Sequence, residues 1–348
     1  MRSDARLVTE ANDLRGMLQE PAPFAKPQEI LPGLSWVRLA LPLRLDHVNV
    51  WLMDDADGMS VIDCGPGTDA NRMFWTKLGG NLFAQKPLRR LIATHSHVDH
   101  VGLSGWFVEK FDVQVVMTLS ESLMARHRHV VLSADAAIAA FMDAHGCPQE
   151  IVELSRMARH ASLRLLGAQP LSILRLRDGD EIRISERSWE VIVTGGHADE
   201  HAALYCAADG LLIAGDEILP HITPAIGVYY DQPEADPLRD YFEALDRFEK
   251  LPDDVLVLPS HGRPFRGLHA RIDGLRAHHA ARLAQVEAML TQEITAFEVA
   301  RILFPRAYDT EHAWLALAEA LAHLHWLRTE GRATRIIDER NRYRFSAR

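Results

Sequence analysis

The sequence is poor in cysteine, in long apolar stretches and in excess positive charge. Only three cysteines occur among 348 residues, Cys64, Cys147 and Cys206, and none belongs to a C-x-x-C pair. This small number argues against a disulfide framework and against a thiolate zinc finger. It is typical of a reduced compartment, so we expect a cytoplasmic protein.

The absence of long apolar runs argues against a membrane protein. No stretch reaches the roughly 18 apolar residues of a membrane span, so no membrane association is expected. Residues 1–28 carry charges throughout and lack the apolar core of a secretory signal. The chain has 48 acidic and 38 basic residues, which gives a net charge of −10. Generic nucleic-acid binders and polybasic membrane binders usually carry a net positive charge.

Two catalytic motifs are also missing. The chain contains neither the G-x-S-x-G of a serine nucleophile nor the G-x-x-x-x-G-K-[ST] loop of nucleotide triphosphate enzymes. Histidine, by contrast, is abundant, with 18 residues. Because histidine is the commonest metal ligand, the positions of these side chains become the main question.

The chain pattern predicts an α/β protein of two domains with a leader. Residues 1–28 form a polar leader with a short helix, residues 29–266 alternate strands and helices, and residues 267–348 are mainly helical. A helical insert at about 120–167 interrupts the alternation with helices near 120–132, 134–145 and 148–166. The chain closes with a two-stranded hairpin at 333–337 and 342–345.

The strongest local signal is the run His95-x-His97-x-Asp99-His100, which directly follows an apolar strand. Alternate side chains of an extended chain face the same way, so His95 and His97 can converge on one point. The irregular turn that follows lets Asp99 and His100 face a second point nearby. Imidazole and carboxylate ligands together suit zinc, iron or manganese rather than calcium.

Three further polar residues stand just beyond other apolar strands. His197 lies in Thr-Gly-Gly-His, Asp216 follows Leu-Leu-Ile-Ala-Gly, and His261 lies in Pro-Ser-His-Gly. Each stands beside a glycine, which permits an unusual backbone turn. They are therefore candidates to complete the coordination of one or two metal ions.

This order of motifs, with Asp63 in Val-Ile-Asp-Cys-Gly as the first, resembles the metallo-β-lactamase superfamily over about residues 30–265. The resemblance implies a four-layer αββα sandwich carrying the helical insert. It also implies two divalent ions, zinc in the first instance, with iron or manganese as alternatives. The implied ligands are His95, His97 and His197 for one metal, Asp99, His100 and His261 for the other, and Asp216 as the bridge, with Asp63 orienting a ligand.

The resemblance implies hydrolysis by a hydroxide shared between two metals, with Asp99 and Asp216 in the catalytic centre. Glyoxalase II-like thioesterases, lactonases and phosphodiesterases of this fold have the bridging aspartate, whereas true β-lactamases usually lack it. We therefore expect a small-molecule thioester, lactone or related ester as substrate. The alternatives are a phosphodiesterase or endoribonuclease with the same metals and a metal-bound binding protein, and a β-lactamase is disfavoured.

Four other residues are weaker candidates for the site. His201 follows a ligand by four positions and is interpreted as catalytic, hydrogen-bonding a ligand or stabilising an oxyanion; a structural histidine is the alternative. His221, Tyr229 and Tyr230 follow Asp216 in an irregular stretch and are candidates for the substrate pocket. Packing of the loop is the alternative for the two tyrosines, and it is slightly favoured.

The C-terminal segment resembles the winged-helix-like tail of a superfamily group related to a mitochondrial endoribonuclease. Residues 328–348 carry seven arginines against three acidic residues, a local charge of +4. A winged helix suggests nucleic acid, but with −10 overall we favour a module that packs on the catalytic domain, covers part of the cleft or forms a homodimer.

Overall fold

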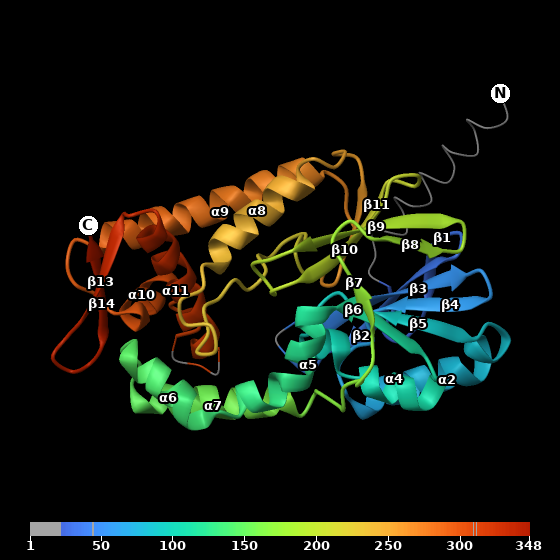
Figure 1. Cartoon of the computed structure of the whole chain (residues 1–348), viewed down its shortest axis with the longest axis horizontal. Coiled ribbons are helices and arrows are strands. Elements are labelled where there is room, and N and C mark those ends of the chain that lie inside the picture. Colours follow the sequence, from blue (N-terminus) through green and yellow to red (C-terminus); the bar gives the residue numbers. More distant parts are fainter. Residues whose placement is uncertain (1–21, 44, 309, 311) are drawn as a thin grey trace.

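Two β-sheets face each other in the computed structural model, which describes residues 22–308 except 44, residue 310 and residues 312–348 (Figure 1). The first sheet, in spatial order, contains β1 (Gln28–Leu31), β2 (Leu34–Ala40), β3 (His47–Asp55), β4 (Gly58–Ile62), β5 (Leu88–Ile92), β6 (Gln114–Thr118) and β7 (Leu174–Leu176). The second contains β12 (Leu256–Pro259), β11 (Leu211–Gly215), β10 (His201–Cys206), β9 (Arg187–Thr194) and β8 (Glu181–Ile184). The predicted leader helix falls largely on residues 1–21, outside the described part.

The sandwich follows from strands that are apolar on both faces. On β2, Trp36 points into the core between the sheets while Val37 points to the outer face, and on β3 Trp51 and Leu52 divide in the same way. Successive side chains of a strand alternate between its two faces, so each sheet can bury one layer against the other sheet and one against helices. The second sheet contributes residues such as Trp189 to the same central layer.

Helices cover both outer faces and complete the four layers. On the first sheet lie α2 (Asp69–Gln85) and α4 (Ser104–Phe111), whose Trp75 and Phe107 pack edge to face at 4.9 Å. On the second lie α8 (Pro237–Phe248) and α9 (Leu268–Met289). The predicted α/β sandwich is thus confirmed.

The helical insert and the C-terminal segment add to this core. The insert forms α5 (Leu119–Leu132), α6 (Asp135–Ala144) and α7 (Gln149–Leu163), close to the predicted limits. After α9 come α10 (Ala296–Leu303), α11 (Ala313–Thr329), β13 (Ala333–Ile337) and β14 (Tyr343–Ala347). Helix α11 packs against α7, α8 and α9, so the insert and the C-terminal segment meet at one end of the molecule (Figure 1). None of the helices described is long and apolar enough to cross a membrane.

Candidate metal centre

The predicted ligands come together where strands end. The chain leaves β5 at Ile92 and runs through His95 and His97 into the short helix α3 (Val98–Val101), which carries Asp99 and His100. His197 follows β9, Asp216 follows β11, and His261 follows β12. These strand ends all open on the same edge of the sandwich, so residues from distant parts of the chain form two adjoining groups.

The first group consists of three histidines and a carboxylate, His95, His97, His197 and Asp216. Nε2 of His95 lies 2.9 Å from Nδ1 of His97 and 3.3 Å from Nε2 of His197. Burial lowers the pKa of His95 and of His97 well below the usual value, and the neighbouring imidazoles add to the effect. Both rings are therefore neutral at pH 7, which is the state in which histidine binds metal.

The second group consists of Asp99, His100 and His261. Nε2 of His261 lies 3.4 Å from Oδ2 of Asp99, and Nε2 of His100 lies 3.7 Å from the same oxygen. Burial opposes a charge here, yet Asp63 and then Asp99 raise the pKa of His100 well above the usual value. A site in which buried carboxylates surround imidazoles attracts a cation, and a divalent metal ion fulfils that role.

Asp216 lies between the two groups. Its Oδ2 is 3.3 Å from Nε2 of His197 in the first group. Its Oδ1 is 3.6 Å from Nε2 of His100 and 3.5 Å from Nε2 of His261 in the second. Burial alone would raise the pKa of Asp216, but His261 and His100 hold it well below the usual range. The ionised carboxylate thus presents one oxygen to each group, as a bridging ligand must.

In three of the five imidazoles, an oxygen acceptor fixes the nitrogen that faces away from the centre. Nδ1 of His100 donates to Oδ2 of Asp63 at 2.7 Å, that of His197 to the Ala225 carbonyl at 3.0 Å, and that of His261 to the His47 carbonyl at 2.7 Å. Such bonds fix the tautomer, so that Nε2 keeps its lone pair for a metal. Asp63 therefore occupies the orienting position predicted for it.

The donor set fits two divalent ions. Nε2 of His100 and Oδ1 of Asp216 are buried and have no hydrogen-bond partner among the described residues. A buried polar atom without a partner is costly, and metal coordination would satisfy both atoms. With Asp216 counted in both groups, the first group offers three nitrogens and one oxygen, and the second offers two nitrogens and two oxygens. Such donor sets are typical of zinc, with iron and manganese as alternatives.

His201 and His221 both lie outside the wall of the cavity described below. His201 is fully buried behind the ligands, does not line the cavity described below, and its Nε2 accepts the backbone N–H of Asp216 at 3.2 Å. It therefore hydrogen-bonds a candidate ligand, which is one of the two roles predicted for it, and does so from a position outside the cavity. His221 is exposed and does not line the cavity either, which corrects its assignment to the pocket.

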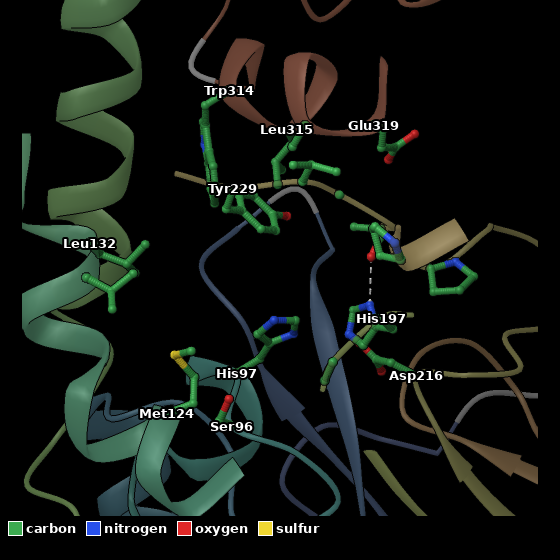
Figure 2. Close-up of a pocket in the computed structure, with 18 of the residues that line it drawn as sticks. Ser96, His97, Met124, Leu132, His197, Asp216, Tyr229, Trp314, Leu315 and Glu319 are labelled. Atoms are coloured by element: carbon green, nitrogen blue, oxygen red, sulfur yellow. Dashed lines mark hydrogen bonds and ion pairs between the residues drawn. The ribbon is translucent and has the colours of Figure 1, made fainter. Parts of the chain in front are cut away.

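Tyr229 and Tyr230, by contrast, do line a cavity of about 470 Å³ that opens from the metal centre. One end is formed by ligands, including His97, His197 and Asp216 (Figure 2). One wall comes from α5, with Met124 and Leu132, and the opposite wall comes from α11, with Trp314 and Leu315 (Figure 2). Cavities of ~300–1,000 Å³ hold small organic ligands.

Sequence reasoning missed residues that shape the centre from distant segments. Glu121 accepts the backbone N–H groups of Ser96 at 2.8 Å and Glu200 at 3.1 Å, which ties together the two loops that carry histidine ligands. Arg128 donates from Nη2 to Oγ of Ser96 at 2.6 Å. Both belong to α5, and no sequence motif distinguishes them; only their hydrogen bonds to the loops that carry the ligands reveal them.

Known proteins share this architecture. Residues 43–261 match the family model of the metallo-beta-lactamase superfamily, and residues 283–348 match that of a metallo-beta-lactamase-like C-terminal domain. A probable metallo-hydrolase of Bacillus subtilis, YqjP, is 27% identical over 301 residues, covering 84% of this chain and 92% of its own.

Two solved structures extend the likeness to nearly the whole chain. A beta-lactamase domain protein from Burkholderia ambifaria is 35% identical with a TM-score of 0.83, covering 94% of this chain and 97% of its own. The metallo-beta-lactamase family protein TTHA1429 from Thermus thermophilus is 33% identical with a TM-score of 0.77, and the match covers 92% of this chain and 100% of that protein. The chain therefore belongs to the metallo-β-lactamase superfamily and is a metal-dependent hydrolase.

Proposed function

We propose that this protein hydrolyses a small-molecule thioester, lactone or related ester at a dinuclear centre, with zinc as the first choice of metal. The observation that carries the proposal is the cavity, which begins at the ligand cluster and continues between apolar side chains of α5, α6 and α11. Such walls suit an acyl or alkyl group. They offer little to a sugar-phosphate backbone, which is bound by repeated positive charges.

Each side chain of the centre has a defined role in this proposal. His95, His97 and His197 would hold the first ion, and Asp99, His100 and His261 would hold the second. Asp216 would contact both ions, and Asp63 fixes the ring of His100. When bound, two divalent ions supply a hydroxide nucleophile near neutral pH and polarise the scissile carbonyl. The chain itself places the acyl group in the cavity and limits the access of bulk water.

A phosphodiesterase or endoribonuclease is the alternative, because the arginine-rich tail suggests nucleic acid. The structure describes ion pairs for five of its seven arginines: Arg328 and Arg335 with Glu234, Arg332 with Glu287, Arg342 with Asp143, and Arg344 with Glu298 and Asp338. Charges neutralised within the chain contribute less to phosphate binding. These pairs support the packing role of the C-terminal segment over an RNA-binding role.

The cellular location and the oligomeric state are two further predictions. A cytoplasmic location is supported by the three cysteines, which are all buried and unpaired. A homodimer through the C-terminal segment remains the alternative to its packing role within one chain.

A panel of substrates tests the proposed function. The protein is reconstituted with zinc, iron(II) or manganese and assayed on acyl-CoA and glutathione thioesters, lactones, single-stranded RNA, a chromogenic phosphodiester and a β-lactam. We expect turnover of at least one thioester, lactone or ester that disappears on chelation and returns with metal. Cleavage of RNA or the phosphodiester alone would refute the ester assignment.

A further inference from the structure

One cationic side chain in the wall of the catalytic cavity forms no ion pair with any carboxylate of the described residues. Arg128, on α5, lines the cavity together with the ligands His97 and Asp99. Its one hydrogen bond among the described residues joins Nη2 to Oγ of Ser96, and its Nε is buried with no partner. Burial lowers the pKa of Arg128, yet a guanidinium stays protonated in proteins, so the cavity contains a lasting positive charge.

The other arginine of the cavity differs in this respect. Arg159, on α7, forms an ion pair with Asp135 at 3.0 Å and also donates to the carbonyl of Leu132. Glu121, one of the acidic side chains near Arg128, is already engaged, because both of its oxygens accept backbone N–H groups. Arg128 is thus the cavity arginine whose charge the described residues do not neutralise by a direct pair.

Keeping an unpaired charge away from bulk water costs free energy. A folded chain is therefore expected to keep such a charge where a ligand supplies the opposite charge. The guanidinium has five N–H donors in a planar fork that matches a carboxylate, and Ser96 uses one of them. A single arginine among acidic side chains such as Glu121 and Asp231 favours an anion of charge −1 over a more highly charged phosphate. The ligand indicated is a carboxylate.

Apolar side chains line the space around Arg128. Met124, Val131 and Leu132 come from α5, Phe141 from α6, and Trp314 from α11. A ligand that reaches both the metals and the guanidinium would therefore lie against hydrocarbon.

We propose that Arg128 is a specificity-determining residue that binds a free carboxylate of the substrate. The substrate class is then a carboxylate-bearing ester, thioester or lactone with an apolar chain between its two polar ends. This inference rests on the proposed function, since it places the scissile carbonyl of such an ester at the metal centre.

Matched substrates and variants test it. The metal-loaded protein is assayed with the 4-nitrophenyl half-ester of adipic acid, the 4-nitrophenyl ester of hexanoic acid, and bis(4-nitrophenyl) phosphate. Arg128→Gln removes the charge, and Arg128→Lys keeps it. Arg126→Gln is the control, because Arg126 is exposed on the same helix and does not line the cavity.

We expect Arg128→Gln to raise KM for the half-ester about 10- to 100-fold, the range typical of a lost charge-assisted hydrogen bond. Its kcat, and both constants for the hexanoate ester, should change less than about threefold. Arg128→Lys should restore part of the lost affinity, and Arg126→Gln should behave as wild type. An equal loss on both esters, or a loss on the phosphodiester alone, would overturn the proposal.

A binding measurement separates this inference from the proposed function. Calorimetry compares succinate, adipate and suberate with the monocarboxylates of equal chain length on the metal-loaded protein. Tighter binding of at least one dicarboxylate, abolished by Arg128→Gln, supports the inference even if no ester is hydrolysed. Equal binding of mono- and dicarboxylates by the wild type would overturn it, even if neutral esters are hydrolysed.

Discussion

Asp63 accepts a hydrogen bond from His100 at 2.7 Å, between two side chains that are both buried. The Asp63 carboxylate also accepts the backbone N–H and the hydroxyl of Thr94, each at 2.8 Å. Asp63 has a φ of 59°, a left-handed conformation that is rare outside glycine, and these bonds hold it there. The strained turn after β4 thus directs a carboxylate at the outer nitrogen of a metal ligand.

Asp63→Asn should weaken metal binding by His100. The amide has one acceptor oxygen in place of two, so it cannot satisfy both Thr94 and His100. Loss of such an orienting bond typically costs about 10- to 100-fold in metal affinity or activity. Elemental analysis after dialysis should find close to one metal per chain in place of two. Asp57→Asn, in the exposed turn before β4, should retain two; equal loss in both variants would contradict the prediction.

Asp216→Asn should reduce metal content and turnover together, because this carboxylate faces both ligand groups. We expect kcat to fall by at least about 100-fold, measured alongside the metal-to-protein ratio. Glu217→Gln is the matched control: Glu217 is fully buried next to Asp216, and burial raises its pKa well above the usual value. The amide is close in shape to the uncharged carboxyl that burial favours, so Glu217→Gln should leave both quantities nearly unchanged. Unaltered turnover in Asp216→Asn would refute the bridging role.

Gly215→Ala should damage the centre through His201. A Cβ at this position would lie 2.3 Å from Nε2 of His201, the atom that accepts the N–H of Asp216. Gly210→Ala is the control, since Gly210 has a similar φ of +59° but nothing within 4 Å of a Cβ. Backbone strain alone should cost Gly210→Ala about 1 kcal/mol. Gly215→Ala should lose more stability by thermal unfolding and should also lose metal; similar losses in both variants would contradict the clash.

The strand-end ligands could be predicted from sequence because each follows a strand rich in apolar residues. The run from His95 to His100 is local, and the strand before it fixes its place in the sheet. The two roles predicted for His201 could not be separated from sequence, because the choice depends on β10, whose first residue turns its side chain into the core and toward Asp216 rather than toward the cavity. Arg128 could not be found this way, since its importance depends on how the insert folds back over the centre.

Glu319 should make the stability of the fold depend on pH. This residue of α11 lines the cavity, and burial raises its pKa to about 7 from an ordinary value of 4.5, although Arg282 opposes the shift. Between these two values the folded protein binds a proton that the unfolded chain does not. The free energy of unfolding therefore falls as pH rises from 4.5 through 7, and it changes no further through this group above that range.

Glu319→Gln should remove this dependence, because the amide stays neutral. The free energy of unfolding of the variant minus that of wild type should be larger at pH 8 than at pH 5, by at most about 3 kcal/mol. Urea unfolding of both proteins at the two pH values, at one metal concentration, measures the change as a difference in which the other titrating groups cancel. Glu339→Gln, exposed in the turn between β13 and β14, should show no such gain. If Glu319→Gln differs from wild type by the same amount at both pH values, its carboxyl does not titrate in the cavity as described.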